Sequence, residues 1–414
     1  MYRTNPVLLS QLKSLGLALV ALFFAFSLVF YPEPTFQASL KGLKIWWDVI
    51  LPALFPFFIA SEILMGLGVV HFMGILLEPL MRPLFRVPGA GGFVMAMGFA
   101  SGYPMGAKLT ARLREQHLLT RIEGERLVAF TCTADPLFLF GAVAVGFFRD
   151  ASFGITIALA HYGASVLVGW LMRFHKGGSE VTTLSHEDQS FFLTRAFRAM
   201  HYARLQDGRT LGKLMGDAIH SSIQTLLMIG GFIMMFSVII QVLTLLGVIH
   251  VLVLLIGPLL QAAGMPMEIS GPVVAGFFEA TLGVQGISNT LPTFSPTDHL
   301  AVAGAVLAWS GLSVHAQVVS ILGKTDIRYT PYLVARFIHA GLAATLTYLL
   351  GVPLKMAEPE VTIPAFAARI SVSGWPSFGE QVLWNAEKTL IVFIVLIGVG
   401  LIAQMMRSQS PAKR

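Results

Sequence analysis

The chain has 414 residues, of which 55% are hydrophobic and only 12% are charged. A water-soluble domain is about 25% charged, so this composition excludes a soluble globular protein and indicates a membrane protein. The net charge of +6 then reflects cytoplasmic loops rather than a nucleic-acid surface, and the single Cys132 excludes an intrachain disulfide framework or a cysteine-based metal cluster.

Apolar runs of about the 20 residues that a helix needs to cross a bilayer recur along the chain. They lack the alternation of a barrel strand, so we predict an all-α polytopic membrane protein. The first run is too long for the apolar core of a signal peptide and has no clear cleavage site, so we expect it to be the first span. Eight runs are expected to be full crossings, at about 12–31, 45–67, 127–148, 152–172, 216–243, 299–322, 331–351 and 384–405.

Two further apolar segments, 91–116 and 271–290, are interrupted near their middle by glycine, proline or polar residues. We expect each to be a re-entrant hairpin that dips into the bilayer and returns. The first lies among many arginines and lysines, whereas the second lies in a stretch between Lys213 and Lys324 that contains neither. The positive-inside rule therefore predicts that the two hairpins enter from opposite faces, the first from the cytoplasm.

With eight crossings, both termini are expected inside, and the basic segment 173–213 is expected in the cytoplasm. Lys41 and Lys44 then fall on the outer side, against the rule.

The two halves of the chain resemble each other. Residues 66–71 read Gly-Leu-Gly-Val-Val-His and residues 245–250 read Leu-Leu-Gly-Val-Ile-His, and each stretch is followed at a matching distance by one of the two interrupted segments. Several matches in the same order indicate an internal repeat. Because the predicted crossings run the halves in opposite directions, the repeat is inverted, which is typical of transporters that hold substrate near the bilayer midplane.

The first interrupted segment centres on Ser101, Gly102, Tyr103 and Pro104. Proline lacks an N–H group and glycine loosens the backbone, so the helix is expected to unwind there and restart. The restarted half-helix would point its positive end at an anionic or electronegative ligand. Lys108, one turn later, either adds a full charge to this site or extends to the membrane surface.

The second interrupted segment places Glu279 inside an apolar run, followed by Thr281, Gln285 and Asn289. Ionisable groups are costly in lipid and usually face a cavity or a partner. Glu279 is therefore expected to bind a coupling cation, to carry a proton or to contact the substrate. The alternative is a structural hydrogen bond between helices.

Two polar stretches follow the interrupted segments at matching places, and in an inverted repeat such places converge. Asp135 precedes Pro136 at an expected helix break, and Ser310, Ser313, His315 and Gln317 lie within an apolar span. His315 is either a proton relay or ligand donor, or a satisfied contact between helices.

Glu62, in the second span, is a further candidate. Enzyme signatures such as a P-loop, a zinc-binding His-Glu-x-x-His motif or a Gly-x-Ser-x-Gly elbow do not occur. Ser313 and His315 point to different faces of a helix and cannot form a dyad there. We therefore expect no catalytic residue, no metal site and no cofactor beyond a coupling cation or proton.

Four runs of the sequence are familiar: Ser-Gly-Tyr-Pro-Met-Gly-Ala-Lys at 101–108, Ala-Asp-Pro-Leu-Phe at 134–138, Gly-Phe-Phe-Glu at 276–279 and Trp-Ser-Gly-Leu-Ser-Val-His-Ala-Gln at 309–317. In these runs the chain resembles the YlbJ-type sporulation integral membrane proteins. That family belongs to the group with nucleoside-recognition Gate domains, which is similar to concentrative nucleoside transporters and to the gates of ferrous-iron transporter B. The resemblance covers about residues 45–350. Asp135 departs from the asparagine or serine of the family pattern.

The expected spans, the basic segment and the resemblance together divide the chain into a first transmembrane helix and loop at 1–44, a Gate-like repeat at 45–172, a cytoplasmic basic linker at 173–213, a second Gate-like repeat at 214–351, and an extracytoplasmic loop with a C-terminal transmembrane helix at 352–414. The resemblance also implies a multi-pass protein of a bacterial cell membrane, and of the outer forespore membrane during sporulation.

The function implied is transport of dipicolinate during endospore formation. The two carboxylates of dipicolinate suit a half-helix N-terminus and Lys108, and its ring suits Tyr103 or Trp309. The residues alone predict only a transporter of a small polar solute. The alternatives are a cation-coupled nucleoside transporter and a non-transporting scaffold for spore assembly. The expected partners are a small-molecule substrate and the lipid bilayer, with no nucleic acid, and a homo-oligomer is compatible with the sequence.

Overall fold

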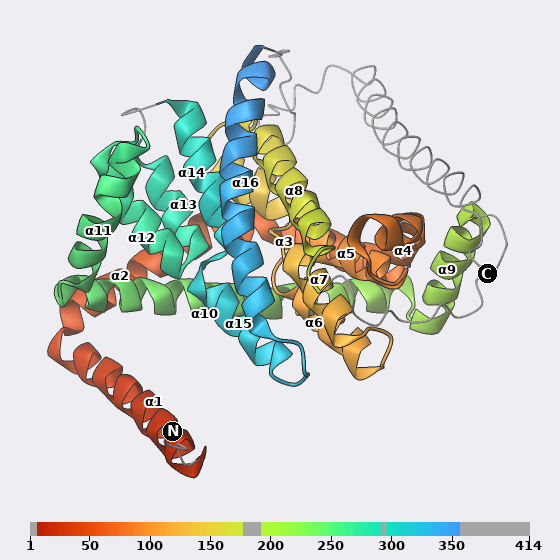
Figure 1. The fold of residues 1–414 in the computed structure, drawn as a ribbon, viewed down its shortest axis with the longest axis horizontal. Coiled ribbons are helices and arrows are strands. Elements are labelled where there is room, and N and C mark those ends of the chain that lie inside the picture. The colour runs from red at the N-terminus through yellow and green to blue at the C-terminus, as the bar shows by residue number, and fades with distance from the viewer. Residues whose placement is uncertain (1–5, 177–191, 291–294, 357–414) are drawn as a thin grey trace.

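The computed structural model describes residues 6–176, 192–290 and 295–356. Within these ranges every regular element is a helix, which confirms the predicted helical class (Figure 1). Five helical stretches of the described residues are long and apolar enough to cross a bilayer: Pro32–Gly66, Phe153–Met172, Leu211–Leu245, Pro296–Leu322 and Tyr329–Gly351. The expected crossing at 384–405 lies outside the described residues, so the count of eight stays a prediction.

The first half of the chain contains eleven of the described elements. They are α1 (Pro6–Phe30), α2 (Pro32–Ile45), η1 (Trp46–Ile50), α3 (Leu51–Gly66), α4 (Val69–Leu80), η2 (Met81–Phe85), α5 (Gly91–Ser101), α6 (Met105–Glu115), α7 (Arg121–Thr131), η3 (Phe138–Phe147) and α8 (Phe153–Met172).

The second half repeats much of this order. Its described elements are α9 (Phe192–Asp207), α10 (Leu211–Leu245), α11 (Val248–Ala262), η4 (Met267–Ile269), α12 (Ser270–Phe278), α13 (Ala280–Ser288), α14 (Pro296–Trp309), α15 (Gly311–Leu322) and α16 (Tyr329–Met356).

The internal repeat is visible at one matched turn in each half. α3 leads into α4 through Gly68, whose φ is 80°, and α10 leads into α11 through Gly247, whose φ is 77°. Only glycine adopts this left-handed conformation without steric cost, which explains why both halves have glycine here. In each half an interrupted pair of helices follows, α5 with α6 and α12 with α13.

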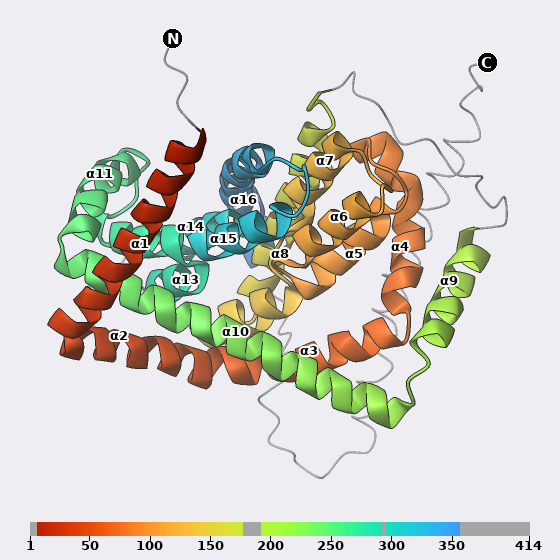
Figure 2. The same cartoon turned by 90° about the horizontal axis from the view of Figure 1, so that it is seen from below.

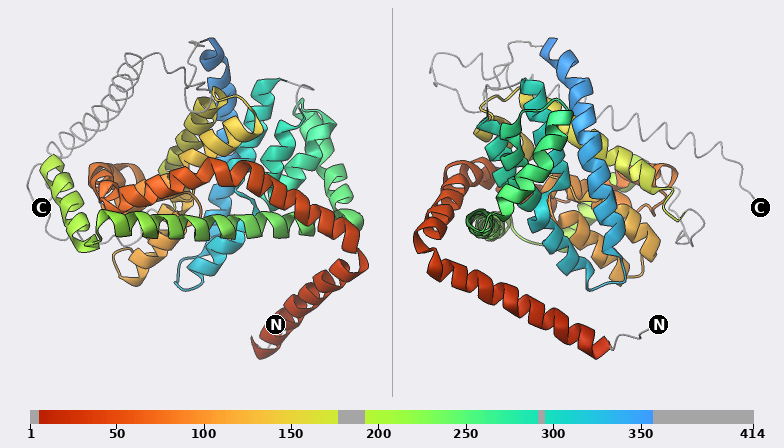
Figure 3. Two further views of the ribbon diagram at one scale, coloured as in Figure 1. Left: turned by 180° about the vertical axis from the view of Figure 1, so that it is seen from behind. Right: turned by 60° about the vertical axis from the view of Figure 1, so that its left-hand side comes forward.

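The segment α2–η1–α3 and α10 are matching long helices that lie side by side (Figures 2 and 3). Ser237 on α10 donates a hydrogen bond to the main-chain oxygen of Ala38, and Ser221 donates one to Glu62. The higher-numbered end of α10 therefore meets the lower-numbered end of α2, so the two helices run antiparallel. An inverted repeat predicts that matching helices run antiparallel.

The expected span at 45–67 begins earlier than the sequence predicted. α2 starts at Pro32 and continues through η1 into α3, so Pro32–Gly66 is one helical stretch of 35 residues. Proline is favoured in the first turn of a helix, and Lys41 and Lys44 lower the hydropathy of this part without interrupting it. The hydropathy minimum at these lysines is therefore not a helix boundary.

Two expected crossings are not single helices. The run 127–148 is interrupted at 132–135, between α7 and η3, and the run 299–322 is interrupted at Ser310, where φ is 72°. The first interruption confirms the helix break expected at Asp135 and Pro136, whereas the apolar character of the second run concealed the one at Ser310. In the basic segment between the halves, α9 begins at Phe192 and ends at Asp207.

Candidate functional site

Four chain interruptions lie in the centre of the molecule, two from each half. They are 102–104 between α5 and α6, 132–135 between α7 and η3, Glu279 between α12 and α13, and Ser310 between α14 and α15. The sequence predicted the first three, from the glycine, proline and polar residues within or beside them. An interruption inside an apolar bundle leaves main-chain groups without helical partners, so it is tolerated only where protein or a cavity supplies them.

The four interruptions contribute to one cavity of about 130 Å³. The predicted site residues that line it are Ser101, Tyr103, Pro104, Asp135, Glu279, Thr281, Ser310, Ser313 and Gln317. α3, η3 and α10 supply further walls, mostly apolar, and Thr225 of α10 adds a polar group that the sequence reasoning missed. The sequence feature that could have identified Thr225 is a hydroxyl side chain within an otherwise apolar span.

Asp135 is 7% exposed and caps the helix that follows it. One carboxylate oxygen, Oδ1, accepts a hydrogen bond of 2.8 Å from the main-chain N–H of Phe138. Gly102 packs directly against this carboxylate, since a Cβ added at Gly102 would lie 2.8 Å from Oδ2 of Asp135. Gly102 has a φ of 71°, so both its backbone conformation and its neighbour require glycine.

Glu279 has the same role in the second half. It is 6% exposed, and its carboxylate accepts hydrogen bonds from the main-chain N–H of Leu282 at 2.8 Å and from the hydroxyl of Thr281 at 3.1 Å. The first turn of α13 is thus capped by the carboxylate of Glu279. These two carboxylates therefore cap the helices that follow them, whereas the expectation that the half-helix restarting after Pro104 faces an anion stays a prediction.

The hydroxyls of the cavity differ in their bonding. Tyr103 donates its O–H to the main-chain oxygen of Leu307, which ties the first interruption to α14. Ser310 donates to the main-chain oxygen of Trp309. Within the described residues, the buried Oγ of Ser101 has no hydrogen-bond partner. Buried hydroxyls are usually bonded, so Ser101 is the protein group best placed to bond a solute.

Five predicted site residues do not line this cavity. Gly102 lies behind Asp135, and the exposed Lys108 lies on α6. Gln285 and Asn289 line a separate pocket on the other face of α13. His315 is buried, with one ring nitrogen 2.6 Å from the Tyr329 hydroxyl and the other 3.0 Å from the main-chain oxygen of Trp309, an arrangement that satisfies both nitrogens.

Glu62 also lies outside the cavity. Its carboxylate accepts the hydrogen bond from Ser221 between the two long helices.

Arg336 on α16 is the most important residue that sequence reasoning missed. It is 0% exposed, and its guanidinium donates hydrogen bonds to the main-chain oxygens of Ala129, Cys132 and Ala308. These oxygens lie at the carbonyl ends of α7 and α14, where a helix leaves acceptors unpaired and carries partial negative charge. Arg336 therefore supports an interruption in each half. In the sequence, the feature that could have identified it is a charged residue inside an apolar run.

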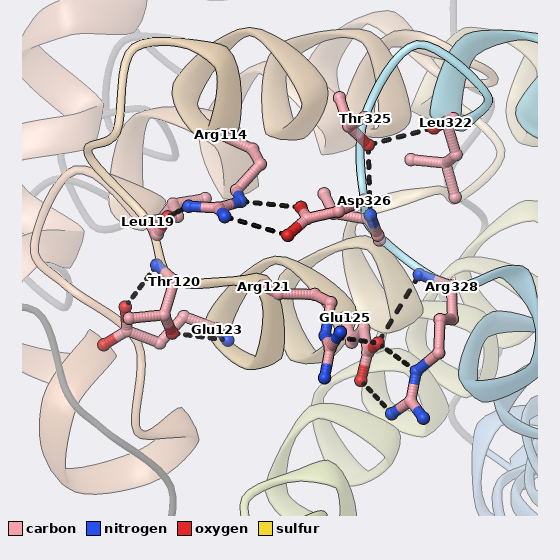
Figure 4. Close-up of polar contacts among 11 residues, drawn as sticks. Arg114, Leu119, Thr120, Arg121, Glu123, Glu125, Leu322, Thr325, Asp326 and Arg328 are labelled. Atoms are coloured by element: carbon pink, nitrogen blue, oxygen red, sulfur yellow. Dashed lines mark hydrogen bonds and ion pairs between the residues drawn. The ribbon is translucent and has the colours of Figure 1, made fainter.

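A second group of ion pairs joins the halves where α6 and α7 meet the 323–328 loop (Figure 4). Arg114 makes a forked pair with Asp326, with N–O distances of 2.8 and 2.9 Å. Arg328 makes another with Glu125, at 2.7 and 3.0 Å, and His175 Nε2 lies 2.8 Å from the same carboxylate. Such bidentate pairs fix relative orientation as well as charge.

These contacts shift the pKa of both carboxyl groups. Burial of the Glu125 side chain raises its pKa, but the hydrogen bonds from Arg328 and His175 outweigh burial and hold the pKa below the ordinary 4.5. The hydrogen bond from Arg114 likewise holds the pKa of Asp326 below its ordinary 3.8. Both groups are therefore ionised in the folded protein at neutral pH.

Each half of the chain matches a known family. The family described as Gate, nucleoside recognition, matches residues 48–160 and 226–325, one segment in each half. The chain is 46% identical over 351 residues to the sporulation integral membrane protein YlbJ of Bacillus subtilis (strain 168), and the match covers 84% of this chain and 85% of that protein.

Solved structures of CNTnw also align with the fold. An inward-facing, substrate-bound state aligns with a TM-score of 0.49 at 14% identity over 83% of this chain and 87% of the other. A single-residue variant of CNTnw in an intermediate state aligns with a TM-score of 0.45 at 14% identity over 84% and 87%. The identity to YlbJ over most of the chain and the two Gate segments agree with each other. The chain belongs to the YlbJ family of sporulation integral membrane proteins and carries the Gate domain.

Proposed function

We propose that this protein is a carrier that moves a small polar or anionic solute across its membrane, with dipicolinate as the leading substrate. The observation that carries the proposal is the convergence of four chain interruptions on one polar cavity. A scaffold has no use for interrupted helices that meet around buried carboxylates and hydroxyls. A carrier needs such groups to replace the hydration of its solute midway across the bilayer.

The charges of the cavity restrict the mechanism. Asp135 and Glu279 both face it, so a dianionic solute would meet two carboxylates. Like charges in a poorly hydrated site repel strongly. A proton or a small cation must therefore accompany the solute, with Glu279 and Asp135 as the groups that hold it. Ser101 and Tyr103 then contact the solute itself.

The size of the cavity also matters. Pockets that enclose small molecules usually measure about 300–1,000 Å³, so a cavity of about 130 Å³ has to widen to admit a dicarboxylate or a nucleoside. We assign the described conformation to a closed state. Opening would separate the interruptions of the two halves, which Tyr103 and Arg336 now join.

The main alternative is a cation-coupled nucleoside carrier. The Gate family is described as nucleoside recognition, and the carboxylates and hydroxyls of the cavity can accept and donate hydrogen bonds to ribose. The link of the resembling family to dipicolinate places that solute first, whereas Asp135 and Glu279 favour a solute without negative charge.

Uptake into proteoliposomes separates these functions. Labelled dipicolinate and labelled uridine are offered to the purified full-length protein under an imposed proton gradient, and then under a sodium gradient. We expect dipicolinate to accumulate under at least one gradient. Accumulation of uridine alone would establish the nucleoside carrier, and movement of neither solute under any gradient would overturn transport.

A further inference from the structure

A second pocket, of about 450 Å³, lies between the long helices and the interrupted pair α12–α13. We call it the outer pocket. α2 and α10 form one side of it, and α12 and α13 form the other. Its volume falls within the range of about 300–1,000 Å³ that small-molecule sites occupy, unlike the central cavity.

Helix α13 separates the outer pocket from the central cavity. Ala280 and Thr281, at its start, face the central cavity, whereas Leu282, Gln285 and Asn289 face the outer pocket. The last three positions recur at helical spacing, so they share one face of α13. α13 has nine residues and contributes to the lining of both spaces.

The polar groups of the outer pocket differ in sign from those of the central cavity. Its lining carries one charged side chain, Lys41, together with the amides of Gln241, Gln285 and Asn289. Within the part of the chain that the structure describes, none of these four side chains has a hydrogen bond or an ion pair. Gln37, also in the lining, donates to Glu33. One ammonium and three free amides are groups that bind a carboxylate.

Lys41 also breaks the rule that orients the rest of the chain. In the topology that the positive-inside rule predicts, Lys41 and Lys44 lie on the outer side, where lysine is disfavoured. A binding role accounts for the position of Lys41 but not for that of Lys44. Lys44, three residues later on α2, does not line the pocket and carries the same charge.

We propose that the outer pocket is a binding site for a small carboxylate solute, with Lys41 as its charged group and with Gln241, Gln285 and Asn289 as its hydrogen-bonding groups. The identity of that solute as a carboxylate rests on the proposed function. The site holds the solute one helix away from the central cavity, and movement of α13 connects the two. The contact of Gly276 with Gly283 lets the two arms of the interrupted pair approach closely.

Equilibrium binding of labelled dipicolinate to the purified full-length protein in nanodiscs tests the site. Replacing Lys41→Gln removes the one charge, so we expect the dissociation constant to rise about tenfold, the loss typical of one hydrogen bond to a charged group. Lys44→Gln is the matched control, and it should change the constant by less than about twofold, as surface substitutions do. If both substitutions weaken dipicolinate binding equally, or if neither weakens it, the proposal is wrong.

Chemical protection gives a second measurement that leaves Lys41 in place. Cys132 is buried, so Asn289→Cys and Lys44→Cys each supply an accessible thiol against a low background. Dipicolinate should slow modification by a water-soluble thiol reagent at position 289 and not at position 44, and unchanged labelling at 289 would contradict the outer site. If the wild type still transports dipicolinate in that case, only the outer site fails. If the wild type transports no solute, the proposed function fails independently.

Discussion

Arg336 donates a hydrogen bond of 2.6 Å to the main-chain oxygen of Cys132, and this contact joins α16 to the interruption after α7. The same guanidinium bonds Ala308, at the end of α14. One arginine of the second half therefore supports the interruption in each half. The cation also offsets the partial negative charge of two helix ends, which would otherwise face each other across the core.

We predict that Arg336→Ala strongly destabilises the protein. The substitution leaves main-chain oxygens buried without donors, at a cost of about 1–3 kcal/mol for each group. Arg336→Lys should lose less, because an ammonium can still donate but cannot form the fork. Thermal unfolding in detergent, followed by tryptophan fluorescence, measures the effect. The exposed Arg112→Ala is the control, and equal melting temperatures for the Arg336→Ala and Arg112→Ala variants would refute the role.

Gly102→Ala is expected to disturb the central cavity through Asp135. The new Cβ would lie 2.8 Å from the Asp135 carboxylate, and alanine at a φ of 71° and a ψ of −163° costs roughly 1–3 kcal/mol. Solute uptake should fall with a modest loss of stability. Gly216→Ala is the matched control, since a Cβ there meets no atom within 4 Å, and it should leave uptake unchanged. Undiminished uptake by the Gly102→Ala variant would show that the position of Asp135 does not matter.

Glu279→Gln separates the charge of this residue from its capping role. Glutamine keeps an oxygen that can accept from the N–H of Leu282, so the fold and melting temperature should change little. Gradient-driven uptake should fall by at least about tenfold, because the group that holds the proton or cation is neutralised. Glu268→Gln, at an exposed position, makes the same chemical change outside the cavity. Full uptake by the Glu279→Gln variant would remove Glu279 from the mechanism.

Stability should depend on pH through Glu125. Its pKa in the folded protein is below the ordinary 4.5, so its ion pairs stabilise the fold fully above about pH 4.5 and lose this contribution as the pH falls through the folded pKa. Glu125→Gln removes the contribution, so the variant should be less stable than the wild type at pH 7. Below pH 4.5 the two melting temperatures should converge.

Melting temperatures measured between pH 3 and pH 7 check this prediction. The exposed Glu115→Gln variant should follow the wild-type curve. Parallel curves for the wild type and the Glu125→Gln variant would contradict the role of the ion pairs.

The sequence predicted much of this architecture for identifiable reasons. Gly102 and Pro104 marked one interruption, and Gly68 and Gly247 marked the repeat, because few other residues tolerate those backbone conformations. The interruption at Ser310 could not be seen, since serine with a positive φ has no local signature. The interruption at Ser310 lies opposite the break before Pro136 because of tertiary contacts, which the local sequence does not reveal.

The candidate site was predicted less completely. Glu279 and Asp135 could be identified because carboxylates are costly in an apolar run, and the same argument would have identified Arg336. Gln285 and Asn289 were grouped with Glu279 because they follow it closely in sequence. Helical spacing puts them on the opposite face of α13, and the sequence could not tell which face meets the centre.

Counterflow tests the central claim most directly, because only a carrier exchanges one solute molecule for another without an imposed ion gradient. Proteoliposomes are loaded with unlabelled dipicolinate and diluted into a trace of the labelled solute. We predict a transient accumulation of label inside that empty liposomes and uridine-loaded proteoliposomes do not show. If neither dipicolinate-loaded nor uridine-loaded proteoliposomes accumulate their labelled solute, the protein is not a carrier of either, and the central claim is wrong.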